Sequence, residues 1–219
     1  MLTDWNRNPF ARALGGSPLP VLIPALLLIT ALLLPAPLRA AGDDAPSKLL
    51  DKPAPLLMGQ GLMTSKLVNI KKLRSEVEYL KDAEGKLVKD DKGALKKEVT
   101  NYAQVLNFFA TYCVPCVKEI PTFNRITETY KGRKVQFYYV NVDVEKTKEE
   151  VAQFAKAKGI AVEMVFPSVK YAMKAYDIDA LPRIVVIDGD GVIRKVIRGF
   201  HEDLAAQMDD VLSGVIPAN

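Results

Sequence analysis

Two cysteines separated by two residues, Cys113 and Cys116, are the only thiols in this chain of 219 residues. They follow an apolar, strand-like run from Ala103 to Ala110 and open a segment with a helical pattern. A thiol at a helix N-terminus meets unpaired backbone N–H groups and the positive end of the helix dipole, and both favour the reactive thiolate. The spacing lets the second sulfur reach the first, so the pair can cycle between dithiol and disulfide.

A static disulfide and half of a zinc site are the alternative interpretations of this pair. A disulfide that closes so short a loop adds little stability, because the entropic benefit grows with loop length. Zinc usually takes four protein ligands, whereas the chain has no third cysteine and a single histidine, His201. Redox chemistry is therefore favoured, no metal or cofactor is expected, and His201 is assigned a cap or surface role.

The two thiols are expected to play different parts. Cys113 is nearer the helix dipole and more exposed, which makes it the candidate nucleophile. Cys116 lies one turn into the helix and would attack the mixed disulfide as the resolving thiol. The intervening Val114 and Pro115 are uncharged, so we expect the Cys113 pKa in the upper part of the range of about 3.5 to 7, or above it. A weakly stabilised thiolate makes the dithiol a better electron donor, which predicts a reductase.

The first 41 residues have the order of an export signal. A polar, mildly basic start precedes an uninterrupted apolar run from Val21 to Leu34, and small residues follow around Ala36 and Ala40. We interpret residues 1–41 as a signal peptide or an N-terminal membrane anchor. The remainder is then exported to the periplasm, either soluble after cleavage or tethered to the inner membrane, where disulfides persist. The net charge is +4 over the whole chain, and residues 1–40, with three arginines and one aspartate, account for +2 of it. The near-neutral remainder gives no electrostatic case for nucleic acid.

Residues 42–100 show weaker patterns. Residues 42–60 are rich in proline, aspartate and glycine and are predicted to be a linker and entry loop. A short strand is expected at 66–70 and a helix at 71–80. Residues 78–98 carry six lysines and six acidic residues, which indicates a solvated insertion at about 78–100, with turns at Gly85 and Gly93. No internal repeat is recognised.

From residue 103 onwards, strand-like and helix-like segments alternate. Strands are expected at 103–109, 135–142, 160–166, 183–188 and 192–197, and helices at 115–130 (kinked at Pro121), 146–158, 169–176 and 202–212, the last ending at Gly214. This order predicts an α/β fold with a central mixed sheet flanked by helices on both faces. The run Asp188 to Gly191 between two apolar segments predicts an antiparallel hairpin at the end of the sheet.

The run from Asn107 to Pro121 resembles the active-site signature of the thioredoxin superfamily, and more narrowly that of the exported TlpA/ResA-like thiol–disulfide oxidoreductases. The segment from Tyr176 to Pro182 and the hairpin from Ile187 to Gly191 are similar to further segments of that family. The resemblance implies a thioredoxin-like domain over residues 61–216.

Several site residues follow from this resemblance. It implies that the peptide bond before Pro182 is cis and that Pro182 faces the cysteines. It also implies that the backbone of Leu181 pairs with the substrate chain. It also implies that Glu119, on the helical face of Cys116, modulates the thiols and accepts a proton, although a solvated surface acid is the alternative. The substrate-contacting residues are expected to be Tyr112, Val114, Pro115 and Leu181. The family usually has tryptophan where this chain has Tyr112, and Leu181 is bulkier than the usual residue.

The sequence thus predicts an exported thiol–disulfide oxidoreductase that reduces client proteins through the Cys113–Cys116 couple, with cytochrome c maturation as one possible pathway. Its expected partners are client proteins with cysteine pairs and an upstream membrane thiol reductant. The alternative is a Sco-like copper chaperone on the same fold. That class has a C-x-x-x-C spacing and a distal histidine ligand, whereas this chain has a spacing of two residues and only His201.

Overall fold

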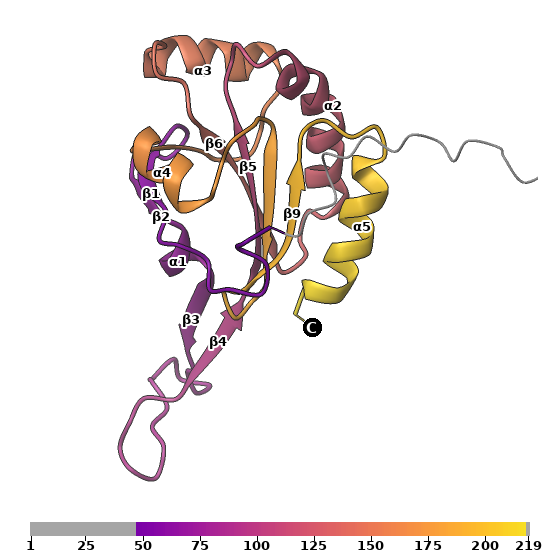
Figure 1. The fold of residues 1–219 in the computed structure, drawn as a ribbon. Coiled ribbons are helices and arrows are strands. Elements are labelled where there is room, and N and C mark those ends of the chain that lie inside the picture. The colour runs from indigo at the N-terminus through magenta and orange to yellow at the C-terminus, as the bar shows by residue number, and fades with distance from the viewer. Residues whose placement is uncertain (1–46, 218–219) are drawn as a thin grey trace, which may run out of the picture. The chain divides into compact units, whose positions relative to one another are not determined.

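A seven-stranded mixed sheet forms the centre of the computed structural model, which describes residues 47–217 (Figure 1). The strand order is β2-β1-β7-β6-β5-β8-β9. The β5–β6 and β6–β7 pairs are parallel, and the other pairs are antiparallel. The strands are β1 (Met58–Gly61), β2 (Leu67–Asn69), β5 (Ala103–Phe109), β6 (Val135–Asn141), β7 (Met164–Pro167), β8 (Arg183–Ile187) and β9 (Ile193–Arg198).

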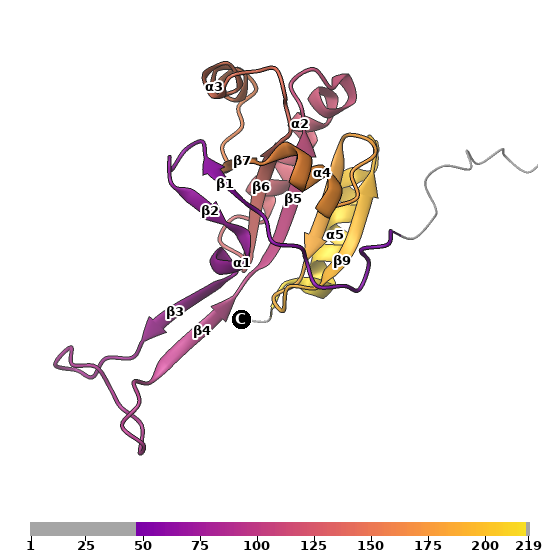
Figure 2. The same cartoon turned by 60° about the vertical axis from the view of Figure 1, so that its left-hand side comes forward.

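Helices cover both faces of this sheet, which confirms the predicted fold class. Figure 2 shows α4 in front of the strands and α5 behind them. All seven residues of β5 are buried, because a strand covered on both faces has no side that meets water. The helices are α1 (Ile70–Leu73), α2 (Val114–Thr129), α3 (Lys148–Ala157), α4 (Val169–Ala175) and α5 (Leu204–Val215).

Aromatic side chains fill the core on either side of β5 and β6. Phe123 of α2 packs edge-on against Tyr139 of β6, with ring centroids 5.0 Å apart. Phe108 of β5 lies against Tyr176, which follows α4, at 4.9 Å. These contacts fix the helices on β6 and on β5, the strand that leads to the cysteines.

A two-stranded ribbon of β3 (Ser75–Tyr79) and β4 (Lys97–Asn101) projects from the domain (Figures 1 and 2). The helix predicted at 71–80 is therefore wrong beyond its first turn, since α1 ends at Leu73. The apolar Val77 and Tyr79 alternate with glutamates, and an alternation of period two belongs to a strand. The charged insertion is thus a hairpin whose strands begin three residues earlier than expected.

The tip of this ribbon contains an eight-residue repeat that the sequence analysis missed. The segments 81–87 and 89–95 both have the pattern Lys-Asp-x-x-Gly-x-Leu. Each forms the same turn, with Gly85 and Gly93 at φ 82° and 81°, so the turns expected at these glycines are present. Three backbone hydrogen bonds close the two turns. The N–H of Leu80 donates to the carbonyl of Lys96, that of Val88 to Leu80, and that of Lys96 to Val88.

Several other boundaries differ from the predictions. The predicted linker at 42–60 already contains the start of β1 at Met58, and the strand expected from residue 160 begins at Met164. The last helix begins at Leu204 and passes through Gly214 to Val215. Helix α2 contains Pro121 within its length, as expected. The interpretation of residues 1–41 lies outside the described residues. None of the helices between residues 47 and 217 has the length and hydrophobicity needed to cross a bilayer.

Candidate redox site

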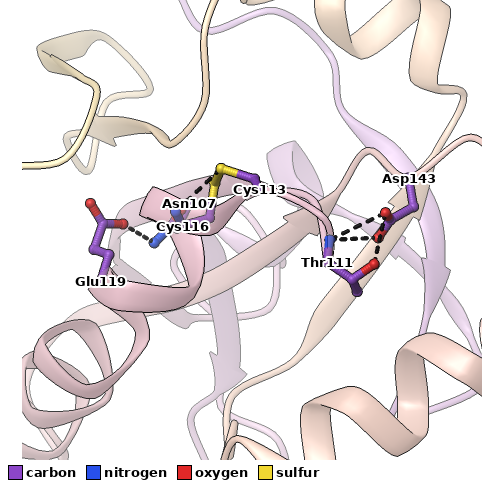
Figure 3. Close-up of a disulfide and its surroundings, with 6 residues drawn as sticks. All are labelled: Asn107, Thr111, Cys113, Cys116, Glu119 and Asp143. Carbon is purple, nitrogen blue, oxygen red and sulfur yellow. Dashed lines mark hydrogen bonds between the residues drawn. A yellow bond between two sulfur atoms is a disulfide. The ribbon is translucent and has the colours of Figure 1, made fainter.

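Cys113 and Cys116 form a disulfide at the junction between β5 and α2 (Figure 3). Their sulfur atoms are 2.03 Å apart and their Cα atoms 5.2 Å apart. The junction lies at the end of the buried strand β5, so a rigid element carries the loop that presents the disulfide. The structure therefore brings together the two thiols that the sequence selected.

Cys113 occupies the N-cap position of α2. The backbone N–H of Cys116 donates to the Cys113 sulfur at 3.2 Å. A sulfur at this position meets helix N–H groups that have no partner within the helix, and they stabilise negative charge on it. The Cys113 residue is 8% exposed and Cys116 is 2% exposed, so the first cysteine is the more accessible one.

Exposed side chains surround this buried pair. Tyr112 and Val114 are each 66% exposed, and Pro115 is also exposed at the start of α2. Large apolar groups at such exposure are available to contact another molecule. They flank Cys113, the accessible half of the disulfide, on both sides in the sequence.

The Leu181–Pro182 peptide bond is cis, as the resemblance implied. Strand β8 runs antiparallel to β5, and Arg183 pairs with Phe108. Continuing this register by one residue sets Pro182 across from Phe109, at the end of β5 that leads to Cys113. Pro182 is buried and Leu181 is partly exposed.

The residue that follows the cis-proline was not singled out from the sequence. Arg183 is 1% exposed and forms an ion pair with Asp179, which also pairs with Arg198 at the end of β9. A buried arginine needs such a partner. These ion pairs connect the cis-proline segment to the neighbouring strand. The sequence signal was an arginine that opens an otherwise apolar strand.

Glu119 is buried in the helix behind the disulfide, so its alternative interpretation as a surface acid is wrong. The residue is 1% exposed, and the side-chain N–H₂ of Asn107 donates to its Oε1 at 2.8 Å. Its Oε2 atom has no hydrogen-bond partner among the described residues. Burial raises the pKa of Glu119 to about 7, and the bond from Asn107 opposes that rise.

A second buried acid, Asp143, holds the loop before Cys113. Its carboxylate accepts hydrogen bonds from the backbone N–H and hydroxyl of Thr111, at 3.0 Å each, and from the side chain of Asn141. Figure 3 places this cluster and the Asn107–Glu119 pair on opposite sides of the disulfide. The sequence analysis missed Asp143 and Thr111. Their one signal was that both follow the ends of adjacent strands, β5 and β6.

His201 is held by its own segment. Its Nε2 donates to the carbonyl of Arg198 at 2.8 Å, and Nδ1 lies 3.9 Å from Asp203. This contact agrees with the expected cap or surface role. Within residues 47–217, no group of three or more histidine, cysteine, aspartate or glutamate side chains is placed to hold a metal ion.

The fold and this site define a thioredoxin-fold protein with a disulfide at the first turn of its helix. Residues 69–212 match the family model described as Redoxin, and the chain belongs to that family, as a TlpA/ResA-like member of the thioredoxin superfamily.

Two relatives support this placement. The chain is 31% identical over 108 residues to the thiol-disulfide oxidoreductase ResA of Geobacillus kaustophilus, which covers 48% of this chain and 61% of that protein. It is 30% identical over 138 residues to ResA of Bacillus thuringiensis subsp. konkukian, which covers 62% of this chain and 73% of that protein. The match to the first relative thus leaves more than a third of its length unaligned.

Solved structures share the fold. A putative thiol:disulfide interchange protein DsbE from Chlorobium tepidum has a TM-score of 0.57 at 19% identity, over 76% of this chain and 99% of that one. A thioredoxin family protein from Chlorobium tepidum TLS has a TM-score of 0.55 at 22% identity, over 79% and 100%. At these identities the likeness concerns the arrangement of the elements.

Proposed function

We propose that this protein is an exported thiol–disulfide oxidoreductase that reduces disulfides of client proteins. One observation carries the proposal: the accessible half of the Cys113–Cys116 disulfide is also the N-cap of α2 and accepts a helix N–H. That position stabilises a thiolate on the sulfur that another molecule can reach. The ResA relatives support the same activity.

The proposed reaction begins from the reduced pair. The Cys113 thiolate attacks one sulfur of the client disulfide, an S–S bond forms between Cys113 and the client, and the second client sulfur leaves as a thiolate. Cys116 then loses its proton and attacks the Cys113 sulfur, which restores the internal disulfide and releases the first client sulfur. The client gains two electrons and, after protonation, two thiol protons. The protein loses the same two electrons.

Glu119 is proposed to receive the proton that Cys116 loses. It lies three residues after Cys116 on the same helix and is buried with one oxygen that has no hydrogen-bond partner. Its pKa of about 7 suits a group that must take up and release a proton near neutral pH. The cis-proline segment at Leu181 and Pro182 is proposed to receive the client backbone beside Cys113.

The direction of electron flow is proposed from the surroundings of the thiols. Val114 and Pro115 carry no charge, and the nearest buried ionisable group on α2 is the acid Glu119. A carboxylate beside a thiol disfavours the thiolate. A dithiol whose thiolate is weakly stabilised gives up its electrons more readily, which favours a reductase.

The cellular setting is also a proposal. The apolar segment within residues 1–41 supports export to the periplasm, with or without a retained membrane anchor. In an oxidising compartment the pair needs an upstream membrane thiol reductant to remain a donor. Client proteins with cysteine pairs, such as those of cytochrome c maturation, are the proposed substrates.

The reduction potential of the couple and a trapping variant test this proposal together. We expect a potential below roughly −200 mV, away from the value of about −120 mV of a strong oxidant. Cys116→Ser should accumulate mixed disulfides with exported proteins, whereas the matched Cys113→Ser variant should accumulate none. A Cys113 pKa near about 4 would reverse the proposed direction, and a Cys116→Ser variant that traps nothing would contradict the activity itself.

A further inference from the structure

A groove opens beside the redox loop on the side of α3. Its volume is about 250 Å³, and it is lined by Thr111, Tyr112, Lys146, Glu150 and Phe154. Two of these residues directly precede Cys113 in the chain. In the sheet order β6-β5-β8, the cis-proline precedes β8, on one side of β5, and α3 follows β6, on the other. The groove is therefore separate from the segment at Leu181 and Pro182.

Two of the side chains that line the groove are aromatic, and they differ in how far they are packed into the protein. Phe154 is stacked on the buried Phe109, with ring centroids 6.2 Å apart and an interplanar angle of 23°. The ammonium group of Lys158 lies 5.9 Å from the centre of its ring. Tyr112, in contrast, is 66% exposed. A ring packed against the core thus lines the groove together with an exposed one.

The rim of the groove has no net charge. Lys146 Nζ lies 3.1 Å from Glu150 Oε1, and the other oxygen of Glu150 accepts the backbone N–H of Thr147. These two charges neutralise each other, so the groove offers no electrostatic attraction to an ion. Its remaining lining consists of the two rings and Thr111, whose hydroxyl is already bonded to Asp143.

We infer that this groove binds one large apolar or aromatic side chain of the client, close in sequence to the cysteine that joins Cys113. The inference rests on the proposed function. While the mixed disulfide exists, the client chain is covalently attached one residue away from Tyr112, which brings side chains next to the joined cysteine within reach of this groove. An aromatic side chain that leaves water between Tyr112 and Phe154 gains apolar burial and ring contacts.

Single-turnover reduction of short peptides tests the inference. Each peptide has one cysteine disulfide-bonded to 2-mercaptoethanol, serine and glycine elsewhere, and phenylalanine at one position at a time. The pre-reduced full chain supplies the electrons, one dithiol for each peptide disulfide. We expect phenylalanine at one favoured position to raise the second-order rate constant about tenfold over the serine peptide, since burial of one ring is worth that factor or more.

Two variants connect this preference to the groove. Lys146→Trp fills the mouth of the groove, and Phe154→Ala removes the aromatic ring that packs on Phe109. Each variant should therefore bring the ratio of the rate constants for the phenylalanine and serine peptides close to one. Lys170→Trp, the same change at another exposed lysine, on α4, is the matched control and should keep the preference. Because Phe154 also packs on Phe109, Lys146→Trp at the exposed rim keeps the test decisive if Phe154→Ala fails to fold.

Bis(2-hydroxyethyl) disulfide, which has no side chain to bind, distinguishes a failure of the proposed groove from a failure of the proposed function. The expected result is that the wild type and all folded variants reduce it at equal rates. Equal rates for phenylalanine and serine peptides at every position, with this small disulfide still reduced, would overturn the groove and leave the proposed function standing. A reduced protein that reacts with neither peptides nor the small disulfide would overturn the proposed function.

Discussion

Glu119 and Asp143 are both buried acids beside the redox loop, but their hydrogen bonding differs. Glu119 has one donor, Asn107, and one oxygen without a partner in the described residues. Asp143 accepts from the backbone and the hydroxyl of Thr111 and from Asn141. Figure 3 shows the two acids on either side of the disulfide.

The difference indicates that the two acids have different purposes. Burial of a carboxylate is costly unless donors replace the water it loses. Asp143 has these donors and uses them to hold the loop in front of Cys113. Glu119 has only the one donor from Asn107, so burial raises its pKa and leaves it with a proton that it can exchange near neutral pH. One acid fixes the geometry of the site and the other is available for proton transfer.

The largest effect is expected from Glu119→Gln. The folded protein keeps the Glu119 proton up to about pH 7, whereas the unfolded chain releases it near 4.5. The folded state therefore binds more protons in this window, and the free energy of unfolding falls by about 3 kcal/mol as the pH rises through it. The variant should lose this slope in urea titrations of the oxidised protein. Glu128→Gln, exposed on the same helix, should keep it, and an unchanged slope in Glu119→Gln would contradict the comparison.

Asp143→Ala should have the next largest effect. It removes the carboxylate that accepts three hydrogen bonds, so the donor groups of Thr111 and Asn141 lose their acceptor. We expect a loss of about 2 kcal/mol in the free energy of unfolding at neutral pH. Glu145→Ala, an exposed acid two residues further on, should change it by less than about 0.5 kcal/mol. Equal losses for the two variants would show that Asp143 does not hold the loop.

Thr111→Val tests one of the hydrogen bonds of Asp143 by itself. The change keeps the shape of the side chain and the backbone N–H bond but removes the hydroxyl that donates to Asp143. The expected cost is about 1 kcal/mol in the free energy of unfolding. Thr111→Ser keeps the hydroxyl and is the control. A valine variant as stable as the wild type, with the serine variant less stable, would show that packing of the methyl group matters here and the hydroxyl bond does not.

The smallest effect is expected from Asn107→Ala on the pKa of Glu119. The bond from Asn107 lowers this pKa against the effect of burial, so its removal should move the pKa further above about 7. Carbon-13 NMR of the Glu119 carboxyl reports the change directly. The same signal should vanish in Glu119→Gln, which verifies its assignment. A downward movement would mean that water replaces the lost donor.

The strand–helix units of the fold could be predicted from the sequence because each has a local pattern. The apolar run before Cys113, the aspartate-glycine hairpin at Asp188 and the cysteine spacing all lie within short windows. The family resemblance also implied the cis bond before Pro182, which the structure has. These features need no knowledge of distant partners.

The remaining features depend on contacts between distant parts of the chain or on an ambiguous pattern. The bond from Thr111 to Asp143 joins residues 32 positions apart, at the ends of two strands whose pairing no local pattern shows. The pairing of Arg198 with Asp179 likewise joins residues 19 positions apart and appears only when β9 lies beside β8. In the ribbon, the many charges concealed the alternation of β3 and the eight-residue repeat.

The ribbon and the disulfide lie beyond opposite ends of β5. β4 ends at Asn101, just before this strand begins, and Cys113 follows its other end. Seven residues of extended chain span roughly 23 Å. A fluorophore attached at the exposed Ala83 in the ribbon tip would thus lie away from the disulfide. It could report tumbling and complex formation while leaving the sulfur chemistry undisturbed.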